Sequence, residues 1–272
     1  MHDIHVLPGF GLREPFSVLS HLLGVGVFLV LAVRLVRRGE GNGIRRAGLA
    51  IMAYTSIQAL LISSLYHAFW PGPMRDLLLR ADVAGIFLMM AGCVTPVHLI
   101  LFTGLWRWVP LMVAWGFALL GAWLKFSVYQ GSPGFAGMVI FLVYGWAGAV
   151  TALEVWRRYG WTCIRKAVFG GLVYTAGAIV LMLHAPTLVD GVIGPHELWH
   201  LAVLCGLSFH WQFIFQIANR ESPAASHRGL GIALPHRLLR PPVYLLYGLS
   251  ANFANRRRRN GKSKAAEMSR PS

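Results

Sequence analysis

Long uncharged apolar stretches alternate with short segments that carry most of the basic residues. A helix needs about 20 residues to cross the roughly 30 Å hydrocarbon layer of a bilayer. Stretches of about this length run over residues 17–36, 47–69, 82–102, 109–126, 134–156, 167–184 and 196–218. The pattern therefore predicts an all-α, polytopic membrane protein whose seven transmembrane helices form a bundle.

The same pattern divides the chain into three regions. A short N-terminal segment covers residues 1–16, the seven-transmembrane domain covers 17–218, and a basic tail covers 219–272. The tail mixes Pro, Ser and Arg, and its one apolar stretch, 241–254, is too short to span a bilayer. We expect the tail to be disordered or to lie on the membrane surface, where its cations attract anionic headgroups.

Composition supports a membrane protein and excludes a typical soluble one. Charged residues make up 13% of the chain, against about 25% in soluble domains, and the mean hydropathy is +0.56. The formal net charge of +15 comes from short loops and the tail rather than from one basic face, so it does not indicate nucleic-acid binding. The expected partners are membrane lipids.

Basic residues are distributed unequally between the loops on the two sides of the predicted bundle. One side carries Arg34, Arg37, Arg38, Arg45, Arg46, Arg107, Arg157, Arg158, Arg165, Lys166, Arg220 and Arg228. The other side carries Arg13, Arg75, Arg80 and Lys125. Because positive charge in short loops is retained in the cytoplasm, we expect a multi-pass protein of the cell (inner) membrane with an external N-terminus and a cytoplasmic C-terminus.

Several polar residues are predicted to lie at one level of the bundle. Ser63 and His67 end the second apolar stretch, Asp82 opens the third, and His196 and His200 open the seventh. With seven alternating crossings, all of these positions fall on the N-terminal side. An Asp within a spanning helix costs about 2.5 to 3.5 kcal/mol on insertion scales, so each such group needs a partner or a function.

The spacing of these residues predicts a metal site. Residues four apart share a helix face, so His196 and His200 can point at one place, and Ser63 lies one turn deeper than His67. Three neutral imidazoles with an open fourth position are typical of catalytic Zn²⁺, which lowers the pKa of a bound water to about 7. Asp82 could then accept the proton of that water, offset the charge of the ion and later protonate a leaving group.

Simpler interpretations apply to the individual residues. The two histidines that open the seventh stretch could be interfacial. His21 lies near the same level on the first stretch and could hydrogen-bond within the site, although a packing role is favoured. We expect His98 and His184 to be interfacial, and His210 to be a polar contact inside the bundle but outside the metal site. Glu197 is expected to favour the helix macrodipole and not to bind the metal.

Together these residues resemble the hemolysin III family, bacterial relatives of the adiponectin and progestin receptors that are also related to the alkaline ceramidases. The resemblance covers about residues 14–218. It rests on residues 14–21 of the first stretch, on Ser63 and His67 of the second, and on the HELWH motif at 196–200. In the third stretch it rests on Arg80, Asp82, Gly85, Ala91, Gly92, Thr95 and Pro96. It implies a seven-helix bundle with zinc held by His67, His196 and His200, and with Asp82 and Ser63 near the metal-bound water.

The chain departs from the family pattern at two positions. Ser20 stands where relatives often have Thr, and Val83 where they often have His. Adiponectin receptors are also described with a cytoplasmic N-terminus and a zinc site near the cytoplasmic side, whereas the loop charges of this chain favour the reverse.

The leading hypothesis is a zinc-dependent membrane hydrolase that acts on amide or ester bonds of lipids, with an embedded pocket that suits an acyl chain. The alternative is a non-enzymatic sensor or regulator of the membrane lipids, in which zinc is structural. A third hypothesis, a pore-forming cytolysin, is suggested only by the family name. The oligomeric state does not follow from the sequence.

Overall fold

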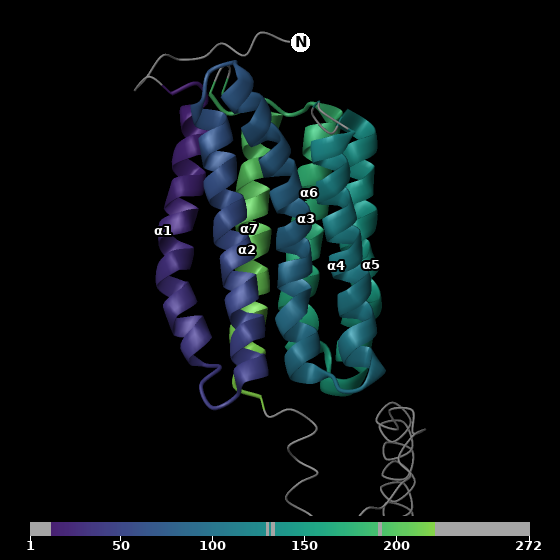
Figure 1. Ribbon diagram of the computed structural model, residues 1–272. Coiled ribbons are helices and arrows are strands. Elements are labelled where there is room, and N and C mark those ends of the chain that lie inside the picture. Colours follow the sequence, from purple (N-terminus) through teal and green to yellow (C-terminus); the bar gives the residue numbers. More distant parts are fainter. Residues whose placement is uncertain (1–11, 129–130, 132–133, 190–191, 221–272) are drawn as a thin grey trace, which may run out of the picture. The chain divides into compact units, whose positions relative to one another are not determined.

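The computed structural model describes residues 12–128, 131, 134–189 and 192–220, and Figure 1 shows their arrangement. Its seven helices are α1 (Pro15–Arg37), α2 (Gly43–Ala68), α3 (Pro73–Leu101), α4 (Leu105–Ser127), α5 (Gly134–Tyr159), α6 (Trp161–Leu183) and α7 (Pro195–Ile217). All seven are long and apolar enough to cross a membrane. The described residues contain no β-strand, so the predicted all-α, seven-helix class is confirmed.

The predicted start of the third helix at Asp82 is wrong, because α3 begins nine residues earlier at Pro73. The first turns of α3 carry the charged residues Arg75, Asp76 and Arg80, which end an apolar window without ending a helix. Pro73 occupies the first helical turn, where its missing N–H has no cost. Asp82 therefore lies more than two turns inside α3. Every other helix boundary lies within six residues of its predicted position.

Consecutive helices pack side by side from α1 to α4 and from α5 to α7, and α7 returns to lie against α1 and α3 (Figure 1). The main core combines buried side chains of α1, α2, α3 and α7, including Phe28, Met52, Leu60 and Trp211. A second cluster, which includes Phe87, Ala118 and Phe141, joins α3, α4 and α5. The first and last helices are therefore packed against the pair that carries His67 and Asp82.

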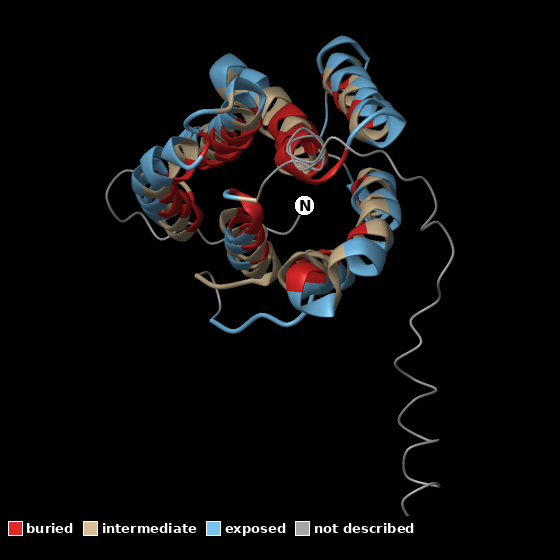
Figure 2. Ribbon diagram, turned by 90° about the horizontal axis from the view of Figure 1, so that it is seen from below, coloured by how far each residue is buried: buried red, intermediate tan, exposed pale blue. Residues whose placement is uncertain are grey.

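The outer surface of the bundle is apolar. Figure 2 shows that exposed residues cover the outward faces of the helices, while buried ones face inward. Leu23 is 71% exposed and Val113 is 67% exposed, although both are large apolar residues. Such a surface is suited to contact with lipid tails, and with the seven long helices it identifies an integral membrane protein.

A cavity of about 320 Å³ lies between α3, α5, α6 and α7. Apolar side chains such as Met89, Phe141 and Val168 form most of its lining, and Trp199 and His210 of α7 also contribute. A cavity of this size is within the range of small-molecule sites.

The predicted basic tail lies outside the described residues from position 221 onward.

Candidate metal centre

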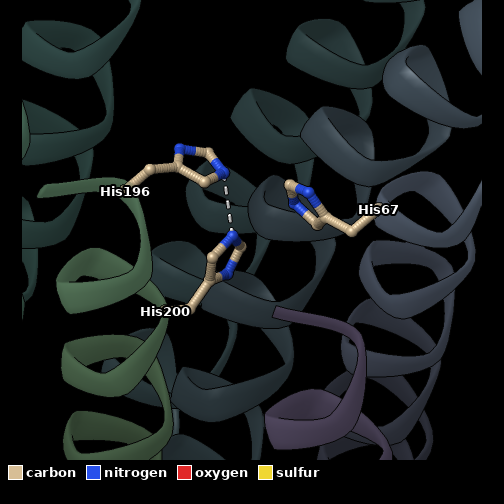
Figure 3. Close-up of side chains that lie close together, drawn as sticks. All are labelled: His67, His196 and His200. Atoms are coloured by element: carbon tan, nitrogen blue, oxygen red, sulfur yellow. Dashed lines mark hydrogen bonds between the residues drawn. The ribbon is translucent and has the colours of Figure 1, made fainter. Parts of the chain in front are cut away.

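The histidines at the end of α2 and the start of α7 come together as predicted. Figure 3 shows the rings of His67, His196 and His200 pointing toward one another. One nitrogen of each ring lies within 4.8 Å of the corresponding nitrogens of the other two, so the three residues could hold a metal ion. His67 and His200 are buried, and His196 is half-buried.

The start of α7 is set by local sequence. Pro195 occupies its first turn, and the Glu197 carboxylate accepts a hydrogen bond from the Gly194 backbone N–H at 2.9 Å. This is the helix N-terminal role predicted for Glu197. It places His196 and His200 in the first two turns of α7, where their four-residue spacing brings both rings to one face.

The distance between these two rings fits a metal site. His196 Nε2 and His200 Nε2 are 3.0 Å apart. Two nitrogens that each lie 2.0 to 2.1 Å from a tetrahedral Zn²⁺ would be about 3.3 Å apart. The lone pairs of two neutral imidazoles repel at such a distance unless a proton or a cation lies between them. His196 and His200 therefore need only a small adjustment to share an ion.

Two of these rings also use their second nitrogen. His67 contacts Glu14, which precedes α1, and His200 contacts His21 of α1. His67 Nδ1 donates a hydrogen bond to Glu14 Oε2, which leaves Nε2 of His67 for a metal. His200 Nδ1 lies 3.0 Å from His21 Nε2, and the His21 ring packs edge-on against the His200 ring. Partners of this kind set the tautomer and orientation of metal-binding histidines.

Of the two roles considered for His21, the favoured one of packing alone needs correction, because His21 is buried and contacts a candidate ligand directly. The contact agrees with the other role, a hydrogen bond within the site. Glu14 was part of the resemblance to the family but was not predicted to take part in the site. Its signal is an acidic residue directly before the first apolar stretch, at the predicted level of the histidines.

Glu14 is the electrostatic centre of this region. Its Oε1 lies 3.5 Å from Arg13 Nε and 3.4 Å from Arg75 Nη2, while Oε2 faces His67. Burial raises the pKa of the Glu14 carboxyl, but the hydrogen bond and charge of His67, with smaller contributions from His196 and Arg13, outweigh it and hold the pKa below its usual value. Glu14 is thus favoured as a carboxylate that can hold the His67 ring.

Asp82 and Ser63, the residues predicted to act beside the metal, lie next to each other. A side-chain hydrogen bond joins them, and Asp82 is close enough to His67 to interact with it electrostatically. Asp82 is half-buried and Ser63 is buried. Neither belongs to the group of three that could bind a metal directly.

His98, His184 and His210 lie outside the group of three. His98 was expected to be interfacial, but it is buried near the C-terminal end of α3, where Trp106 O and Thr151 Oγ1 lie 2.6 and 3.0 Å from its ring nitrogens. His184 is exposed at the end of α6. His210 stacks on Tyr174 and lines the cavity, as expected of a polar contact inside the bundle.

Comparison with known proteins extends the likeness across most of the chain. The family described as Haemolysin-III related matches residues 11–211, which include every residue of the candidate metal centre. Hemolysin-3 of Bacillus cereus is 25% identical over 197 residues, which cover 71% of this chain and 86% of the relative. A Hemolysin-3 homolog of Bacillus subtilis (strain 168) is 22% identical over 196 residues, 71% of this chain and 89% of the relative. The chain therefore belongs to the Haemolysin-III related family.

Proposed function

We propose that this protein is a zinc-dependent intramembrane hydrolase of lipid amide or ester bonds. The observation that carries the proposal is the convergence of three imidazoles, from α2 and α7, beside a carboxyl and a hydroxyl group inside an apolar bundle. A donor set of three imidazoles with room for a further ligand is typical of catalytic zinc sites.

In this proposal His67, His196 and His200 hold the ion. A bound Zn²⁺ supplies a Lewis acid that polarises the substrate carbonyl and favours ionisation of a water molecule near neutral pH. Glu14 and His21 keep the rings of His67 and His200 oriented through their second nitrogens. The surrounding helices exclude bulk water from the reacting bond.

Asp82 moves the proton. Its carboxylate oxygen accepts a proton from the attacking water as the water oxygen bonds to the carbonyl carbon. As the C–N or C–O bond breaks, Asp82 returns this proton to the leaving nitrogen or oxygen, so the products are a fatty acid and an amine or alcohol. Ser63 orients Asp82 through their hydrogen bond.

The surroundings of the site suit a lipid substrate. The outer faces of the helices are apolar, and the cavity between α3, α5, α6 and α7 is lined mostly by apolar side chains. Trp199, which lies between His196 and His200 in the sequence, contributes to this lining. An acyl chain in the cavity would extend away from the metal centre on the α7 side.

The test is release of free fatty acid by the purified protein from a panel of ceramide-like lipids and phospholipids, beside a His67→Ala variant. We expect release by the wild type and none above background by the variant. Elemental analysis should find about one zinc per chain in the wild type and little in a His200→Ala variant. A wild type that releases no more fatty acid than His67→Ala across the panel would contradict the hydrolase.

One feature favours a second candidate, in which the metal is structural and the protein senses or regulates membrane lipids. The ligands come from α2 and α7, and Glu14 and His21 connect them to α1, so an ion would tie three helices together. Metal-binding energy would then contribute to folding. This candidate predicts that chelation lowers the unfolding temperature sharply while no lipid is hydrolysed.

The name hemolysin of the relatives suggests membrane lysis, but the cavity gives a pore little support. A conducting pore needs a polar or water-filled lumen. The described cavity is lined mostly by residues such as Met90, Val97 and Phe213. We therefore prefer the hydrolase.

A further inference from the structure

Arg75 lies on the same face of α3 as Asp82. The two residues are seven positions apart, which corresponds to about 20° around a helix and about 10 Å along its axis. Because α3 begins at Pro73, both belong to one continuous helix. Arg75 therefore lies two turns from Asp82, toward the start of α3.

The contacts of Arg75 place it beside this centre, in a group with Arg13 and Glu14 that we call the rim. Its Nη2 is 3.4 Å from Glu14 Oε1, and its guanidinium carbon lies 4.3 Å from the centre of the Tyr66 ring, next to His67 in the chain. It is also close enough to His196 to interact electrostatically. The guanidinium thus contacts the carboxylate that holds His67 and the chain neighbour of His67.

Two arginines at this rim have buried donors without an acceptor. Arg75 Nε and Arg13 Nη1 are both buried and form no hydrogen bond within the described residues. Among the described residues both guanidiniums pair with one carboxylate, that of Glu14. A buried charged donor without a partner is costly, so the rim is complementary to an additional oxyanion.

We propose that Arg75 and Arg13 bind the phosphate group of an anionic phospholipid beside the metal centre. The planar guanidinium group matches phosphate oxygens in shape and charge. In a glycerophospholipid the ester carbonyls lie a few bonds from the phosphate. A phosphate held at Arg75 would therefore direct an ester deeper along the face of α3 that carries Asp82. The proposed hydrolase would then act on anionic glycerophospholipids. The reaction rests on the proposed function, but the binding does not, since a lipid can bind without being hydrolysed.

The test measures binding to the purified, metal-loaded full-length protein in a neutral detergent. The probes are a short-chain ether-linked phosphatidylglycerol, which has no ester to hydrolyse, the matched dialkylglycerol without phosphate, and inorganic phosphate. We expect the wild type to bind the phospholipid at least about tenfold more tightly than the dialkylglycerol. Arg75→Gln should lose about tenfold in affinity for the phospholipid while its affinity for the dialkylglycerol stays unchanged.

The matched control is Arg37→Gln, which removes an exposed arginine at the other end of α1 and should keep the wild-type preference. Arg75→Lys retains the positive charge but lacks the planar guanidinium, so it should bind the phospholipid with intermediate affinity. If Arg75→Gln fails to retain its metal, Arg75→Lys takes its place in the test. Equal affinity of the wild type for both lipids, or an undiminished preference in these variants, would overturn the proposal. Inorganic phosphate that competes as strongly as the phospholipid would overturn the lipid as the source of the phosphate. A protein that prefers the phospholipid but releases no fatty acid from ester lipids would contradict only the hydrolase.

Discussion

Two residues outside the group of three contact the candidate metal ligands. Glu14 engages the second nitrogen of His67, and His21 faces that of His200. Each ring is thus fixed from the side opposite the candidate metal, and its ligand nitrogen is oriented before an ion binds. Such partners commonly change metal affinity by 10- to 100-fold when they are removed.

Replacing Glu14 with Gln tests this role, because the amide keeps the shape of the side chain and removes its charge. We expect Glu14→Gln to weaken zinc binding by about 10- to 100-fold, as measured by competition with a chromophoric chelator. Asp76→Asn is the matched control, since it removes an exposed acid in the first turn of α3 at the same end of the bundle. Equal zinc affinities of the two variants would show that Glu14 does not position His67.

The three metal-binding candidates and the nearby pair Ser63 and Asp82 could be predicted from the sequence, whereas the role of Glu14 could not, and that of His21 was left open. The spacing of His196 and His200 and the alternation of the crossings are enough to bring three rings to one level. The contact between His21 and His200 spans 179 positions and depends on the rotation of α1 against α7. Hydropathy does not encode that rotation, so the sequence left two roles open for His21, packing and a hydrogen bond within the site.

At the scale of the helices, α2 and α3 approach closely where small residues face each other. A Cβ atom added to Gly92 of α3 would lie 1.9 Å from Thr55 Oγ1 of α2. The Thr55 hydroxyl is held by a hydrogen bond to Ile51 O at 3.0 Å, so it is not free to move away. Gly92 therefore permits the packing that brings the helix of His67 next to the helix of Asp82.

Gly92→Ala should destabilise the protein by about 1 to 3 kcal/mol, because overpacking forces the two helices apart. The measurement is the unfolding temperature of the purified protein in detergent. Gly116→Ala is the control: this glycine of α4 is exposed, and an added Cβ would meet nothing within 4 Å. A variant at Gly92 as stable as the one at Gly116 would rule out a close contact between α2 and α3 at this point.

The helices themselves were predictable because an apolar stretch of membrane length has few other structures available to it. The start of α3 was missed for the same reason, since hydropathy detects the hydrocarbon layer and not the helix. Arg75, Asp76 and Arg80 extend α3 beyond that layer. Proline at position 73, a common first residue of helices, was the available signal.

For the whole molecule, the unequal loop charges predict the orientation. The side that contains Arg37, Arg38, Arg45 and Arg46 should be cytoplasmic, and the metal centre should lie near the outer face. A C-terminal fusion to alkaline phosphatase should be inactive, and one to green fluorescent protein should fluoresce. Phosphatase fused after α6, at Leu183, should be active because this point lies on the opposite side. An active phosphatase at the C-terminus would reverse the assignment.

The distribution of the site along the chain also has a consequence for biosynthesis. Glu14, His21 and His67 emerge from the ribosome early, whereas His196 and His200 belong to the last of the seven helices. A nascent chain can assemble the three ligands only after α7 has entered the bilayer. Acquisition of an ion by the three candidate ligands would therefore follow the insertion of α7, and chains truncated before α7 would remain without it.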